Sequence, residues 1–75
     1  MLTAQVLAKE LGSRGVVILA VTRHRTLPDV LVVYLHGNAG QWVDGTAVRR
    51  VGRVPGVVAV SESVPTPTIL LVRVR

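Results

Sequence analysis

The sequence predicts an α+β fold with the element order αββαββ, in which a four-stranded antiparallel sheet carries two helices on one face. Four short runs, VVILAV, VLVVYL, VVAV and ILLV, are apolar at nearly every position, which is typical of strands covered on both faces. Two other segments repeat apolar residues every three or four positions, as amphipathic helices do. We expect residues 1–75 to form a single α+β domain, because so short a chain cannot bury two cores.

The first half of the chain contains one predicted helix and two predicted strands. Thr3 can cap the helix and Gly12 can end it, since threonine is favoured at helix starts and glycine just after helix ends. β-branched residues, which favour strands, dominate the two runs that follow. The pattern predicts a helix over Ala4–Leu11 and strands over Val16–Arg23 and Val30–His36.

The second half repeats this outline with a shorter helix. Asp44 or Thr46 can cap the helix, which is expected to run to about Arg53. The proline-containing segment VPTP interrupts the ladder hydrogen bonds and therefore separates two strands, expected over Val57–Ser63 and Thr68–Arg75. Although the two αββ halves are alike in outline, we find no convincing internal repeat in the sequence.

The αββαββ order is that of a ferredoxin-like plait whose first strand has moved to the end, which is a circular permutation. This topology places the fourth strand in the middle of the sheet beside the second, and the first and third strands at the edges. The polar third strand, VVAVSES, suits an edge. The segment from the second helix through VPGVVAV resembles the second half of ferredoxin-like modules such as ACT and heavy-metal-associated domains. That resemblance covers less than half of the chain and implies the fold pattern alone.

Alternation along the second and fourth strands predicts which residues share a face of the sheet. Leu31, Val33 and Leu35 are expected on one face together with Leu70, Val72 and Val74. The other face, called the open face below, is expected to show an aliphatic patch with a basic rim of His36, Arg73 and Arg75. The patch consists of Val30, Val32, Tyr34, Ile69 and Leu71.

The chain has too little material to cover both faces of a four-stranded sheet, so we expect something to cover the open face. The main hypothesis is a second copy or another subunit of a larger particle, such as a phage virion or phage accessory assembly. Burial of several hundred Å² of apolar surface would drive such association. The alternative cover is the segment Gly37–Gly45, whose Trp42 is either a lid over the sheet or an anchor for a partner.

Net charge is +5, from eight arginines and one lysine against four acids. Arginine neutralises phosphate, so a basic nucleic-acid-binding or regulatory protein, which contacts phosphates or an acidic partner, is a second hypothesis. Its candidate contacts are Arg49, Arg50 and Arg53 on the second helix and Arg23 and Arg25 near a strand end. The same composition also fits a solvated basic surface or a coding bias toward arginine, valine and alanine.

No residue pattern indicates catalysis, a metal or a cofactor. His24 and His36 are the only imidazoles and there is no cysteine, whereas a zinc site needs three or four ligands. Gly12–Gly15 matches the GxxG of nucleic-acid-binding KH domains, but an apolar strand follows it, so a helix stop and a turn are expected there. No run reaches the roughly 18 apolar residues of a membrane span. We therefore expect a non-enzymatic, cytoplasmic or virion-borne interaction module that self-associates through its open sheet face or a strand edge, with no cofactor and no small-molecule substrate.

Overall fold

The computed structural model describes residues 2–36, 46–62 and 68–75. Its elements follow the predicted order, and their ends differ from the prediction by at most two residues. They are α1 (Ala4–Ser13), β1 (Ile18–Arg23), β2 (Val30–Leu35), α2 (Thr46–Gly52), β3 (Val57–Glu62) and β4 (Ile69–Val74). Trp42, Asp44 and the rest of the Gly37–Gly45 segment lie outside the described residues, so the predictions made for them stay predictions.

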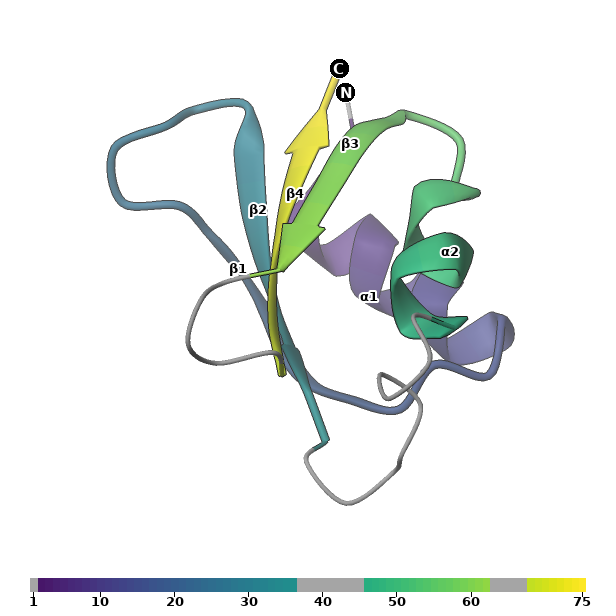
Figure 1. Ribbon diagram of the computed structural model, residues 1–75. Coiled ribbons are helices and arrows are strands. Elements are labelled where there is room, and N and C mark those ends of the chain that lie inside the picture. The colour runs from purple at the N-terminus through teal and green to yellow at the C-terminus, as the bar shows by residue number, and fades with distance from the viewer. Residues whose placement is uncertain (1, 37–45, 63–67) are drawn as a thin grey trace.

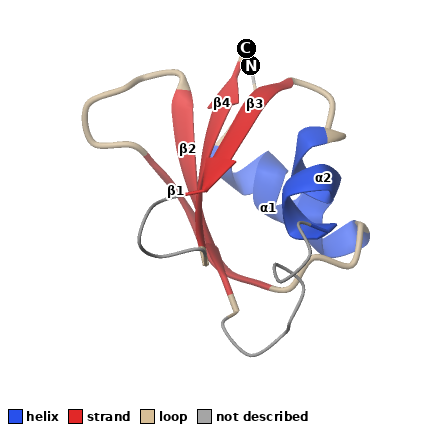
Figure 2. Ribbon diagram, in the orientation of Figure 1, coloured by secondary structure: helices blue, strands red, loops and turns tan. Residues whose placement is uncertain are grey.

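The sheet is antiparallel throughout, with the strand order β1-β2-β4-β3 (Figure 1). The placement of β4 beside β2, with β1 and β3 at the edges, is confirmed. Both helices lie on the same side of the sheet (Figure 2). The protein is therefore a two-layer α+β structure with one sheet face turned away from the helices.

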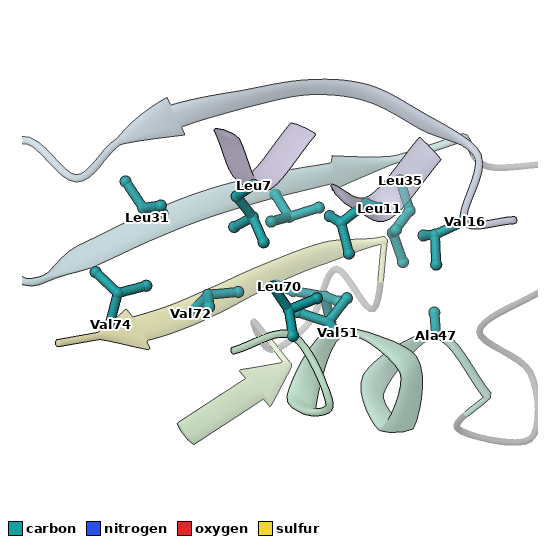
Figure 3. Close-up of a cluster of buried hydrophobic side chains, with 12 residues drawn as sticks. Leu7, Leu11, Val16, Leu31, Leu35, Ala47, Val51, Leu70, Val72 and Val74 are labelled. Atoms are coloured by element: carbon teal, nitrogen blue, oxygen red, sulfur yellow. The ribbon is translucent and has the colours of Figure 1, made fainter. Parts of the chain in front are cut away.

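A wholly apolar core fills the space between the sheet and the helices. The helices contribute Leu7, Leu11, Ala47 and Val51, which are each 0% exposed (Figure 3). The central strands contribute the set expected from the alternation, which is Leu31, Val33, Leu35, Leu70, Val72 and Val74. No buried residue in the described part of the chain is polar or charged. Among those residues, no helix combines the length and the hydrophobicity that a bilayer crossing requires.

Helix α1 begins where the sequence predicts and ends two residues later. The Thr3 side chain accepts a hydrogen bond from the Val6 N–H at 3.2 Å and so caps the first turn. At the other end, Gly12 remains inside the helix, and the chain leaves it at Gly15, whose φ is +78°. The expectation that Gly12 ends the helix is wrong, because the left-handed residue that terminates it is Gly15.

The turn after α1 has the hydrogen bonds of a Schellman motif. The Gly15 N–H donates to the Gly12 carbonyl at 3.2 Å, and the Val16 N–H donates to the Leu11 carbonyl at 3.0 Å. Leu11 and Val16 are both buried in the core, which supplies the hydrophobic contact that accompanies this motif. The GxxG segment therefore serves as a helix stop, as expected.

The two halves of the protein are related by a pseudo-two-fold axis normal to the sheet. Equivalent strands begin 39 residues apart, at Ile18 and Val57 for the edge strands and at Val30 and Ile69 for the central strands. Each edge strand has a bulge at the matching place, Leu19 in β1 and Val58 in β3. At this offset four strand positions are identical: Ala20 and Ala59, Val21 and Val60, Leu31 and Leu70, Val33 and Val72. The similarity in outline that the sequence indicates is thus a correspondence of strands and bulges, supported by few identical residues.

Candidate functional site

The open face of the sheet is the candidate site, because both helices pack against the opposite face. β2 and β4 form its centre, where Val32 lies opposite Leu71 and Tyr34 lies opposite Ile69. The edge strands add small residues on each side, Ala20 and Thr22 from β1 and Ala59 and Ser61 from β3. The structure thus brings together on one surface all the predicted interface residues that it describes.

The apolar surface of the open face is distributed differently from the prediction. Val30 and Val32 are only 6% and 9% exposed, so the expectation that they present an aliphatic surface is wrong. Both lie on the central strand β2, which has a neighbouring strand on each side. Tyr34 is 36% exposed, and Ile69 and Leu71 are half-buried.

Three strongly exposed apolar side chains lie around the edge of this surface, at positions that the sequence analysis did not single out, whereas Val6 is exposed on α1. Leu19 is 67% exposed and Val58 is 54% exposed, each at a bulge in an edge strand. Leu27, in the loop between β1 and β2, is 46% exposed. A β-bulge inserts one unpaired residue, and no feature of an all-aliphatic run marks which residue that is.

A hollow of about 290 Å³ lies on the open face beneath the β1–β2 loop. Its walls are mainly apolar, and one end is formed by a guanidinium group. The lining residues are Leu27, Val30, Ala59, Ser61, Leu71 and Arg73. Because Leu27 and the far edge strand β3 line the same hollow, the loop bends over the sheet, and the open face is concave at this end.

The loop that carries Leu27 is held by a histidine side chain. Nδ1 of His24 accepts hydrogen bonds from the backbone N–H groups of Thr26 at 3.2 Å and Leu27 at 3.1 Å. The His24 N–H donates to the Val30 carbonyl at 3.0 Å and closes the loop at its base. The imidazole thus serves as a turn cap that fixes one wall of the hollow.

Arg73 is the one charged residue among the open-face positions of the four strands. Its Nε lies 3.5 Å from Oδ2 of Asp29, and the two side chains are 60% and 50% exposed. The other residues of the predicted rim lie at opposite ends of the sheet, since His36 follows β2 and Arg75 follows β4. The centre of the open face therefore has no unbalanced charge, and its polar groups lie at the ends.

The predicted phosphate contacts are divided between two parts of the surface. Arg49, Arg50 and Arg53 are exposed on and just after α2, whereas Arg23 and Arg25 lie at the β1–β2 hairpin, away from α2 in Figure 1. Arg23 lines a separate hollow of about 390 Å³ together with the first residues of α1. The five arginines do not form one continuous cluster, and their contact with nucleic acid stays a prediction.

Arg50 has a structural role that the sequence did not indicate. Its Nη1 donates to the carbonyl oxygens of Arg14 at 3.2 Å and Gly15 at 3.5 Å, just after the end of α1. A cation at this position satisfies carbonyls that the helix leaves unpaired and complements the negative end of the helix dipole. Arg50 thereby connects α2 to the C-terminal end of α1.

Within the described residues, no group of three or more His, Cys, Asp or Glu side chains lies close enough to hold a metal ion. Comparison with known proteins finds no family model that matches the chain, and no curated protein or solved structure that is significantly similar to it.

Proposed function

We propose that the protein is a non-enzymatic interaction module that self-associates through the open face of its sheet, as a subunit of a larger assembly. The proposal rests chiefly on one observation, that a concave and mostly apolar sheet face is left uncovered by the described elements. Around that face, the side chains of Leu19, Leu27 and Val58 are 67%, 46% and 54% exposed, and exposed apolar groups gathered on one surface are typical of interaction sites. Covering it with another protein surface removes apolar area from water and stabilises a small domain whose own core is limited.

The size of the open face supports a small but specific interface. Strands lie about 4.8 Å apart and rise about 3.3 Å per residue, so a sheet of four strands of six residues covers roughly 400 Å². Two such faces bury roughly 800 Å² together, and the exposed side chains of Leu19, Leu27 and Val58 extend each face. The sum approaches the ~1,000 Å² at which specific interfaces begin.

Association through the strand edges, the alternative route for self-association, is disfavoured by the bulges. β1 and β3 both carry a bulge where a second chain would have to continue the ladder. Bulges interrupt the row of evenly spaced N–H and C=O groups that edge-to-edge pairing requires, and natural sheets use them to block it. The face, rather than either edge, is therefore the surface that we propose for association.

The test is the oligomeric state of the wild-type protein and of two matched variants. Leu27→Glu places a charge beside the hollow, whereas Val6→Glu places one on α1, on the side of the protein away from the open face. The two side chains are almost equally exposed, 46% and 49%, so neither change disturbs the core. Glutamate at position 6 also suits the first turn of a helix capped by Thr3.

We expect a dimer or larger species for the wild type and for Val6→Glu, and a monomer or much weaker association for Leu27→Glu. Size exclusion with light scattering over a concentration series measures this. A wild-type protein that stays monomeric at all concentrations, or equal association by both variants, would contradict the proposal. Circular dichroism of each variant checks that it is folded.

We also propose that the topology is a ferredoxin-like plait circularly permuted by one strand. The support is the strand order, because moving the first strand of a plait to the end of the chain gives the order β1-β2-β4-β3 with both helices on one face. A variant that carries the β4 segment ahead of α1 tests this proposal. Retention of the wild-type circular dichroism spectrum and cooperative unfolding is expected, and an unfolded product would contradict it.

A further inference from the structure

The pseudo-two-fold axis of the fold passes through the centre of the open face. Val32 and Leu71 are direct cross-strand partners and are also equivalent positions of the two halves, 39 residues apart. The axis therefore passes between them. It relates Val30 to Ile69 and Tyr34 to Arg73, so the last two side chains lie at diagonally opposite ends of the face.

These two equivalent positions carry complementary chemistry. Tyr34 presents an aromatic ring that is 36% exposed, and Arg73 presents a guanidinium whose side chain is 60% exposed. A guanidinium over an aromatic face is attracted by the ring quadrupole and stacks on it. Within one copy the two residues lie too far apart to meet, because Arg73 lies opposite Val30 and Tyr34 lies four residues further along β2.

We infer that the partner on the open face is a second copy, arranged so that Tyr34 of each copy enters the hollow beside Arg73 of the other. This inference rests on the proposed function. A two-fold axis in the plane of the interface, perpendicular to the line from Tyr34 to Arg73, exchanges the two ends of the face. One symmetry operation then forms the tyrosine–arginine contact twice, as an isologous interface requires.

The geometry of this arrangement agrees with the way that sheets pack. The line from Tyr34 to Arg73 shifts by one strand, about 4.8 Å, over four residues, about 13 Å, so it is inclined roughly 20° to the strands. The two-fold rotation inclines the strands of the second copy by the same angle in the opposite sense. The strands of the two copies therefore cross at roughly 40°. Aligned sheets in β-sandwiches cross at about 30°, because each sheet is twisted.

The hollow provides the space that the inserted ring needs. Arg73 lines it together with Leu71, Ala59 and the overhanging Leu27, so a ring entering there contacts apolar walls while it stacks on the guanidinium. Its volume of about 290 Å³ exceeds that of one tyrosine side chain. At the opposite end of the same face, Tyr34 lies between Ala20 and Ile69. Ala20 is small and Ile69 is half-buried, so the tyrosine ring can project from the face between them.

Exchange of the two residues is a direct test, because the pseudo-symmetry makes each position a substitute for the other. Tyr34→Arg alone places arginine against arginine at both ends, and we expect the dimer dissociation constant to rise at least tenfold. Arg73→Tyr alone removes both cations and is expected to weaken the dimer several-fold. The double variant restores the contact with its members exchanged, so its dissociation constant should return to within about threefold of the wild-type value.

Sedimentation equilibrium on the four proteins measures these constants, and circular dichroism checks their fold. No rescue in the double variant, in a protein whose wild type dimerises and whose Leu27→Glu variant does not, overturns this docking arrangement and leaves the proposed function intact. A monomeric wild type overturns both. Rescue with a dissociation constant close to the wild-type value supports both.

Discussion

Two glycines three residues apart are expected to respond to the same substitution with opposite signs. Gly12 lies inside the last turn of α1, and a Cβ built there meets nothing within 4 Å. Gly15 has a φ of +78°, and a Cβ there lies 3.2 Å from Nη1 of Arg50. Alanine at position 12 therefore lowers the backbone entropy of the unfolded chain and stabilises the helix. Alanine at position 15 instead introduces backbone strain into the folded protein.

The magnitudes follow from the backbone conformations. Alanine is favoured over glycine in a helix by about 0.5–1 kcal/mol, so Gly12→Ala should stabilise the protein by up to that amount. An L-residue in the left-handed region costs roughly 1–2 kcal/mol, and in Gly15→Ala the Arg50 guanidinium, which donates to the carbonyl oxygens of Arg14 and Gly15, must also shift slightly away from the new Cβ. We expect the two variants to differ by about 2 kcal/mol in the free energy of unfolding.

Urea unfolding followed by circular dichroism at 222 nm measures this difference. All proteins are compared at one protein concentration, because association would couple the midpoint to concentration. For a domain of this size, about 1 kcal/mol corresponds to a shift of roughly 4–8 °C in Tm, so a thermal scan gives a second readout. Equal effects of the two substitutions, or a more stable Gly15→Ala variant, would refute the assignment of Gly15 as the residue that ends α1.

Three further substitutions test local hydrogen bonds, each with a conservative partner as control. His24→Ala should destabilise the hairpin loop by about 1 kcal/mol, whereas His24→Asn should retain most of that stability, because Oδ1 of asparagine can accept in place of Nδ1; thermal unfolding decides between them. Arg50→Ala should cost about 0.5–1.5 kcal/mol in urea unfolding, and Arg50→Lys less, since an ammonium keeps the charge at the helix end. Thr3→Ala should cost about 1 kcal/mol while Thr3→Ser costs little, and equal losses for this pair would contradict the cap.

The sequence was sufficient for most of the fold because its signals are local and periodic. The permuted plait places the second and fourth strands at the centre, the apolar runs around Val33 and Val72 and the polar end of β3 agree with that order, and the structure has it. The alternation also identified the core face correctly. Exposure on the other face was predicted less well, because alternation within one strand indicates the face on which Val32 lies and not how much of its side chain is covered there.

The 39-residue offset between the two halves and the positions of the bulges were not predicted, for a related reason. The identical pairs at the 39-residue offset, such as Val21 and Val60, are aliphatic residues that recur throughout the chain, so the match is indistinct without a structural register. The helices add to the difficulty, since Leu7 and Leu11 match Ala47 and Val51 at an offset of 40. The correspondence of the two halves rests on the paired bulges and the strand register.

Added salt is expected to have opposite effects on self-association and on nucleic-acid binding, and this difference separates the two functional hypotheses. Two copies of net charge +5 carry +10 together, so self-association works against electrostatic repulsion. Added salt screens that repulsion and should leave the dimer as tight or tighter. Binding to nucleic acid would instead weaken steeply with salt, because each neutralised phosphate releases a counterion.

Arg53 offers a cleaner test of the nucleic-acid hypothesis than Arg50 does. Arg53 is exposed, whereas Arg50 bonds to carbonyl oxygens at the end of α1, so loss of Arg50 would change stability and binding together. If α2 contacts phosphates, Arg53→Ala should weaken binding to a labelled oligonucleotide and reduce the slope of log K against log salt by about one unit. Salt-strengthened dimerisation, with no oligonucleotide shift in either protein, is the result that the open-face proposal expects. Salt-sensitive oligonucleotide binding by a monomer, weakened by Arg53→Ala, would instead place the function on the helical side of the protein.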